Sequence, residues 1–145
     1  MSALTLEQAQ TIVTTALAHA RAEKFQPLAV LVLDARGVPK AFAAEDGTSL
    51  RRYEIASGKA HGALSMGIGS RALAKRAATT PHFIAAVTHA VGGSLIPVPG
   101  GVLIRTADRA IIGAVGISGD NSDNDEAAAI AGITAAGLTA DPGEG

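Results

Sequence analysis

The chain has 145 residues, 48% of them hydrophobic and 3% aromatic, with 12 Lys and Arg against 13 Asp and Glu. This length predicts one domain over residues 1–145, and the balanced charge with few aromatic rings excludes a surface that binds nucleic acid. The absence of cysteine excludes disulfides, thiolate nucleophiles and zinc–cysteine sites.

The start of the chain carries no basic segment followed by an apolar run, and no apolar run approaches ~20 residues. We therefore expect neither a signal peptide nor a membrane-spanning segment. A cytoplasmic protein is the resulting expectation.

The first third of the chain predicts a helix followed by a β-hairpin. Apolar residues recur at helical spacing over 6–24, and Thr5 with Gln8 forms a capping-box pattern at the start. The continuous apolar run 28–33 is typical of a strand covered on both faces. A turn ending in Gly37 leads to a second strand over 38–44, in which Pro39 marks an edge strand or the start of a strand.

The middle of the chain is expected to be helical. A segment over 50–66 has an apolar and a polar side, and the glycines at 67 and 69 end it. Ser70 is expected to cap a short helix that carries Arg71. Thr80 and Pro81 then open another helix, which runs to about Val91.

A glycine-rich hairpin follows. The apolar runs 102–104 and 111–117 read as strands joined by a loop at 106–109. Glycines along the second strand indicate a bulge or a close approach of another backbone or flat ligand, with ordinary helix-on-sheet packing as the alternative. A last helix begins near Ser122 and runs to about Leu138, and 141–145 is expected to be a solvated tail.

These elements predict an α+β fold, in which four or five antiparallel strands carry helices. Two patterns that suggest a metal site do not fit one. The acidic run 120–125 lacks the Gly and Glu of a calcium-binding loop and reads as a helix start. His82 and His89 are two helical turns apart, or about 10 Å, which is too far to share one metal ion. We therefore predict no metal site.

The residues best suited to chemistry lie in 54–61 and 67–71. Lys59, His61 and Arg71, with the Gly-rich turn that ends at Ser70, would suit a carboxylate or another small anion. A solvated helix face is the alternative. Serine hydrolysis and nucleotide binding through a Walker loop have no motif in support.

Several motifs resemble the GlcG/HbpS-type haem-degrading-domain family, which also supplies the C-terminal domain of PduO-type adenosyltransferases. The resemblance covers nearly the whole chain. Its most specific parts are Pro-Gly-Gly-Val at 99–102, Gly-Ala-Val-Gly-Ile-Ser-Gly at 113–119, and Asp125-Glu126 at the start of the last helix. It implies a central antiparallel five-stranded sheet flanked by helices, with a profilin-like α-β-α layout. It also implies self-association, from dimers up to octamers.

The family resemblance implies a small-molecule ligand, with haem as the one candidate cofactor. Some members bind haem or iron. The haem ligands differ between members, a histidine or a cysteine among them, and this chain has no cysteine. Of its four histidines, only His61 lies in a stretch that matches the family pattern. A glutamate-pair iron site is not visible, since Glu54 has no acidic partner three or four residues away.

Two functions follow from these residues. The first is a small-molecule-binding accessory protein that holds haem or another tetrapyrrole in an apolar cleft lined by Gly100 and Gly101. The second is a cofactor-free isomerase or lyase of small-acid or aromatic breakdown. In that enzyme His61 or Glu54 would act as general base, while Lys59 or Arg71 would hold a carboxylate.

Overall fold

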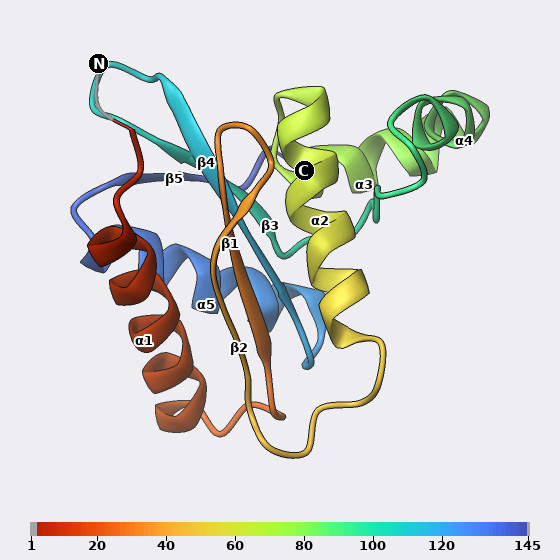
Figure 1. Cartoon of the computed structure of the whole chain (residues 1–145). Coiled ribbons are helices and arrows are strands. Elements are labelled where there is room, and N and C mark those ends of the chain that lie inside the picture. Colours follow the sequence, from red (N-terminus) through yellow and green to blue (C-terminus); the bar gives the residue numbers. More distant parts are fainter. Residues whose placement is uncertain (1–2, 145) are drawn as a thin grey trace.

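The computed structural model describes residues 3–144, in which five helices and five strands form three layers (Figure 1). In chain order the elements are α1 (Leu6–Ala22), β1 (Ala29–Asp34), β2 (Pro39–Ala44), α2 (Arg52–Met66), α3 (Ser70–Thr79), α4 (Pro81–Ala90), β3 (Gly101–Arg105), β4 (Ile111–Ser118), α5 (Ser122–Ala135) and β5 (Thr139–Asp141). The predicted α+β class is confirmed.

The five strands form one antiparallel sheet in the order β2-β1-β4-β3-β5. Helices α1 and α5 pack together against one face, and α2 lies along the other over β1, β4 and β3. Helix α4 lies at the periphery, away from the sheet (Figure 1). Strand β2 is an outer strand, as Pro39 predicted.

The continuous apolar run of β1 feeds both hydrophobic cores. Val30 and Val32 belong to the core under α1 and α5, whereas Leu31 and Leu33 belong to the core under α2. Successive side chains of a strand point to opposite faces, so a strand covered on both sides must be apolar throughout. Each such buried side chain contributes about 1.5–3 kcal/mol.

Helix α2 packs very closely on β4 because β4 lacks side chains at the contact. A Cβ atom built on Gly116 would lie 1.9 Å from the backbone oxygen of Ala56 in α2. Ala60 and Ala63 continue the small-residue face of this helix. Another backbone therefore approaches this strand, as the glycines indicated, and it belongs to a helix that packs on the sheet. The predicted bulge is also present, because the register between β3 and β4 shifts between Ile104, opposite Gly113, and Arg105, opposite Ile111.

Most predicted helix boundaries agree with the structure within a few residues. The capping box at Thr5 and Gln8 is confirmed by hydrogen bonds of 3.0 and 3.1 Å. The cap predicted at Ser70 is wrong: Gly69 is the N-cap of α3, and the Ser70 hydroxyl instead accepts a hydrogen bond from the backbone N–H of Gly101.

The expected solvated tail differs from the structure. Residues 139–141 form β5, and Arg105 of β3 binds the Asp141 carboxylate at 2.7 Å. The Pro142 carbonyl accepts a hydrogen bond from the backbone N–H of Arg71. A strand of three residues without apolar alternation cannot be recognised from its own sequence. Residues 139–142 are held instead by contacts with Arg105 and Arg71, which are distant in the chain.

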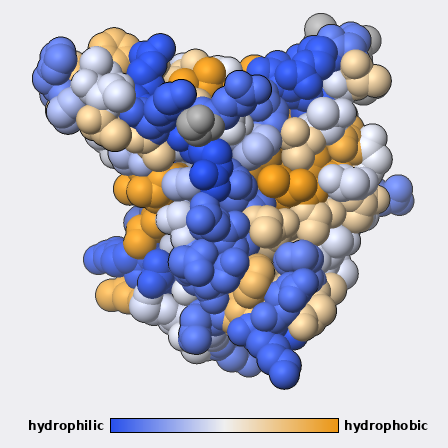
Figure 2. Space-filling view, turned by 180° about the vertical axis from the view of Figure 1, so that it is seen from behind, coloured by the Kyte–Doolittle hydropathy of each residue, from blue (hydrophilic) through white to orange (hydrophobic). Residues whose placement is uncertain are grey.

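The back of the molecule carries hydrophobic patches on both sides of a central hydrophilic band (Figure 2). Within residues 3–144, no helix is both long and apolar enough to cross a membrane.

Candidate functional site

Lys59, expected to hold a carboxylate ligand, is bound to a carboxylate of the protein itself. Its ammonium group lies 3.0 Å from an Asp125 oxygen and donates to the Ile117 carbonyl at 2.9 Å. Both side chains are almost fully buried, at 3% and 2% exposure. Burial lowers the pKa of Lys59 and raises the pKa of Asp125, while their mutual attraction opposes both shifts.

The Pro-Gly-Gly turn explains how Lys59 reaches α5 from the opposite face of the sheet. Gly100 has φ +119°, and a Cβ atom there would lie 2.8 Å from the Lys59 ammonium nitrogen. A Cβ atom on Gly101 would lie 2.3 Å from the Lys59 carbonyl oxygen and 2.9 Å from the Ser70 hydroxyl. The two glycines thus make room for the lysine and the serine.

Arg71 also binds protein carboxylates. Its guanidinium contacts both carboxylate oxygens of Glu126, at 2.9–3.2 Å, and an Asp123 oxygen at 2.5 Å. These hydrogen bonds raise the pKa of Arg71 above its usual value. The N-terminal end of α5 therefore holds both α2 and α3. The sequence predicted that these acidic residues begin a helix, but no sequence pattern indicated that Lys59 and Arg71 would bind them.

His61 lies on another side of α2 and has a different environment. Its Nδ1 atom is 2.9 Å from the backbone oxygen of Ser94, in the loop after α4. A carbonyl oxygen only accepts hydrogen bonds, so Nδ1 carries the proton and Nε2 of the neutral ring keeps its lone pair. The Cδ2 edge of the ring faces Gly37 in the β1–β2 turn. The side chain is partly exposed.

A hollow of about 430 Å³ lies between α2 and the loop after α4. His61 does not line it, but its Nδ1 contacts the backbone oxygen of Ser94, which does. Ser57, one helical turn before His61, lines it together with Ser94, and Tyr53, Glu54, Ile55, Ile96 and the two glycines at 92 and 93 complete the lining. Glu54 is exposed and pairs with Arg51 at 3.1 Å. Glu54 and His61 are two helical turns apart, about 10 Å along the axis.

The candidate site residues thus fall into two groups. Lys59, Ser70, Gly100 and Gly101 meet in a buried cluster, and Arg71 binds Asp123 and Glu126 at the start of α5. Glu54 lines the hollow, and His61 lies one helical turn after Ser57, which also lines it. Of the other histidines, His82 and His89 are exposed on α4, and His19 packs edge-on against Phe25.

The family model described as haem-degrading protein HbpS-like matches residues 4–134, which is most of the chain. The chain belongs to the HbpS-like family. The resemblance inferred from the Pro-Gly-Gly and β4 motifs is confirmed. No curated protein matches the chain.

Solved structures agree with this family. The structure described as HbpS is 30% identical, with a TM-score of 0.78 over 92% of this chain and 90% of that chain. A double mutant of HbpS from Streptomyces reticuli is also 30% identical, with a TM-score of 0.77 over 92% and 87% of the two chains. The PduOC:heme complex shares the fold at 23% identity, with a TM-score of 0.84 over 94% and 97%.

Proposed function

We propose that this HbpS-like protein is a haem-binding accessory protein in which His61 would hold the haem iron. Membership of the HbpS-like family supports haem as the ligand, and a structure of similar fold is described as a heme complex. The observation that carries the assignment to His61 is the hydrogen bond from its Nδ1 to the Ser94 carbonyl.

That hydrogen bond is the arrangement expected of a metal-binding imidazole. Histidine ligands commonly donate their other ring N–H to a carbonyl or carboxylate, which fixes the ring orientation and raises the basicity of the ligating nitrogen. In this chain the Ser94 carbonyl has that role and leaves Nε2 for the iron. Bound haem would supply a redox-active iron whose properties depend on this ligand.

The surroundings of His61 suit an apolar ring with a polar edge. Ile55, Ile96 and Tyr53 line the adjacent hollow with apolar surface, while Glu54, Ser57 and Ser94 add polar groups. The buried Lys59–Asp125 pair is a poor alternative anchor, because a ligand would have to displace an internal ion pair.

Titrating the purified protein with haemin tests this proposal. The unmodified protein should give a sharp, shifted Soret band, and His61→Ala should lose the shift and bind at least about tenfold more weakly, a difference of about 1.4 kcal/mol. His82→Ala and His89→Ala are matched controls, because both histidines are exposed on α4. A Soret shift that persists in His61→Ala would refute the assignment of the ligand.

The cofactor-free isomerase or lyase gains no support from these contacts. Lys59 and Arg71, which were expected to hold a substrate carboxylate, are bound to Asp125 and Glu126. Binding is therefore the function that the geometry favours.

A further inference from the structure

Two buried glycines of α2 lie beside His61. Gly58 is three residues before the histidine and Gly62 is one residue after it, and the two glycines are one helical turn apart on the same side of the helix. Glycine is disfavoured in a helix interior, because it loses more conformational freedom on folding than any other residue. The residue type at these positions therefore has to be explained by what packs against them.

The loop after α4 fills the space that the two missing side chains leave. A Cβ atom on Gly58 would lie 2.3 Å from Cγ1 of Ile96, and one on Gly62 would lie 2.9 Å from Cγ of Leu95. The backbone N–H of Ile96 also donates to the Gly58 carbonyl at 3.0 Å. The segment 94–96 therefore runs along α2 in direct contact with its main chain.

The same segment is held from its other side. Leu95 is 3% exposed and packs with Leu73 of α3 and Ile84 of α4 in a small core of their own. Since the next two residues are fixed between α2 and this core, the Ser94 carbonyl has little freedom to move. Its oxygen is the group that lies 2.9 Å from Nδ1 of His61.

We propose that Gly58 and Gly62 are positioning residues for His61. They let the loop lie close enough to α2 for the Ser94 carbonyl to accept the Nδ1 proton. A methyl group at position 58 would push the loop away, and a hydrogen bond weakens steeply as its distance and angle depart from the ideal values. This role rests on the proposed function only in that Nε2, which the bond leaves unprotonated, is the atom that would hold the iron. The positioning itself is a property of the haem-free protein.

Nitrogen-15 NMR of the haem-free protein measures the imidazole tautomer directly. At about pH 8.5, above the ordinary histidine pKa of about 6.5, the ring of His61 should be protonated on Nδ1 in the unmodified protein. In Gly58→Ala the population should shift toward the Nε2–H tautomer, because the Ser94 acceptor has moved. Gly62→Ala should act in the same direction, since its methyl group would also lie 3.2 Å from the Leu95 Cα atom.

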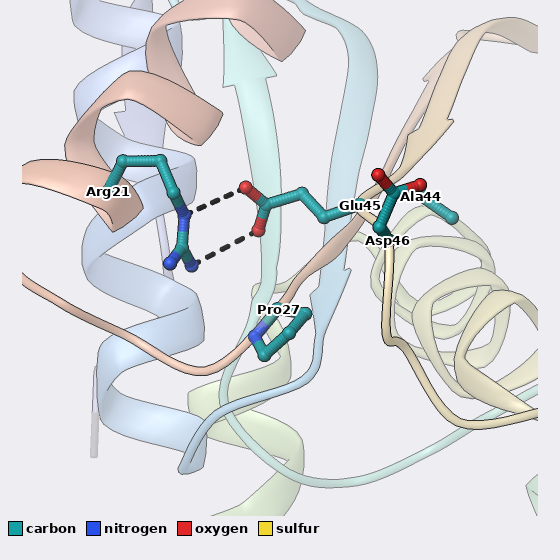
Figure 3. Close-up of a pocket in the computed structure, with 5 residues that line it drawn as sticks. All are labelled: Arg21, Pro27, Ala44, Glu45 and Asp46. Atoms are coloured by element: carbon teal, nitrogen blue, oxygen red, sulfur yellow. Dashed lines mark hydrogen bonds and ion pairs between the residues drawn. The ribbon is translucent and has the colours of Figure 1, made fainter.

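A compensating substitution separates positioning from general damage to the fold. Gly58→Ala/Ile96→Ala should restore the Nδ1–H tautomer, because it removes the atoms nearest the new methyl group and leaves only the Cβ of residue 96, at 3.3 Å. Glu45→Gln is the control for lost stability. It removes one charge of the ion pair with Arg21 of α1, at 2.8 Å, on the other face of the sheet from α2 (Figure 3). The tautomer of His61 should not change in this control.

Haemin titration extends the test to the proposed ligand. Loss of a group that orients a metal-binding histidine typically costs 10–100-fold in affinity, so Gly58→Ala should bind haemin about tenfold more weakly and Gly58→Ala/Ile96→Ala should regain most of this affinity. The reduction potential of the bound haem should shift in Gly58→Ala and return in the double variant, because the basicity of the ligating nitrogen changes.

The two proposals fail in different ways. An unchanged tautomer in both Gly58→Ala and Gly62→Ala, or a double variant that does not restore it, would overturn the positioning role, even if His61→Ala loses the Soret shift. Tautomers that change and recover as expected, in a protein that never shifts the Soret band of haemin, would support the positioning role and refute haem binding.

Discussion

Lys59 and His61 are two residues apart, yet they occupy opposite environments. An α-helix turns by about 100° per residue, so residues two apart point to nearly opposite sides. Lys59 enters the protein interior and binds Asp125, while His61 remains at the flank of α2. The helical periodicity of the sequence already places these two residues on different sides of α2. The predicted anion site that combined them was therefore wrong in this respect.

Removing one partner of the buried Lys59–Asp125 pair should lower the free energy of unfolding much more than replacing both partners with uncharged residues. Lys59→Met leaves Asp125 buried without its cation, and we expect a loss of about 3–5 kcal/mol in the free energy of unfolding. Lys59→Met/Asp125→Asn should recover a large part of this loss, since no charge is then buried. Urea denaturation of both variants measures the difference. Equal losses in the two variants would contradict this account.

Asp120 should contribute to the acid sensitivity of the protein. The backbone N–H groups of Gln26 and Asn121 donate to its carboxylate and lower its pKa. A lowered pKa stabilises the fold above the unfolded-state value of about 3.9, and that stability is lost as the pH falls through the lower folded value.

Asp120→Asn should therefore flatten the decline in unfolding free energy below about pH 4. Urea denaturation over a series of acidic pH values measures this slope. Glu23→Gln, at an exposed position after α1, is the control and should leave the slope unchanged. An unaltered slope in Asp120→Asn would exclude this contribution.

At the scale of elements, the contact between α2 and β4 depends on a missing side chain. Gly116→Ala would place a methyl group against the Ala56 carbonyl, and relieving this overlap requires α2 to move off the sheet. We expect a loss of at least about 1–3 kcal/mol in the free energy of unfolding.

Gly67→Ala offers a comparison with a different physical cause. Gly67 has φ +71° and nothing within 4 Å of an added Cβ, so its cost is conformational strain alone. Amide hydrogen exchange separates the two variants: only Gly116→Ala should speed exchange along α2. Equally slow amide exchange along α2 in both variants would show that the packing of α2 on β4 does not depend on Gly116.

Elements with strong local patterns were predictable, and those fixed by distant partners were not. The capping box and the two-sided apolar run of β1 carry their own signals within a few residues. Strand β5 depends on Arg105 of β3, which is 36 residues away from Asp141. The partners of Lys59 and Arg71 are 66 and 55 residues distant, so sequence patterns showed reactive residue types without showing that they bind each other.

At the scale of the whole molecule, ion pairs connect the helices on the two faces of the sheet at one end of the three-layered fold. The N-terminal end of α5 binds α2 through Asp125 and α3 through Glu126, although α2 lies on the opposite face of the sheet from α5. The Pro-Gly-Gly turn provides the passage for this connection. The family motifs therefore maintain the architecture, while the histidine proposed to hold haem lies elsewhere, at the flank of α2.

One consequence concerns how the protein can diverge. The group that orients His61 is the main-chain oxygen of Ser94, so the residue type at position 94 can change without loss of this hydrogen bond. Selection must instead preserve the path of the chain through Gly92 and Gly93, both of which have positive φ. Related proteins that keep this histidine should therefore vary at the serine and retain the two glycines before it.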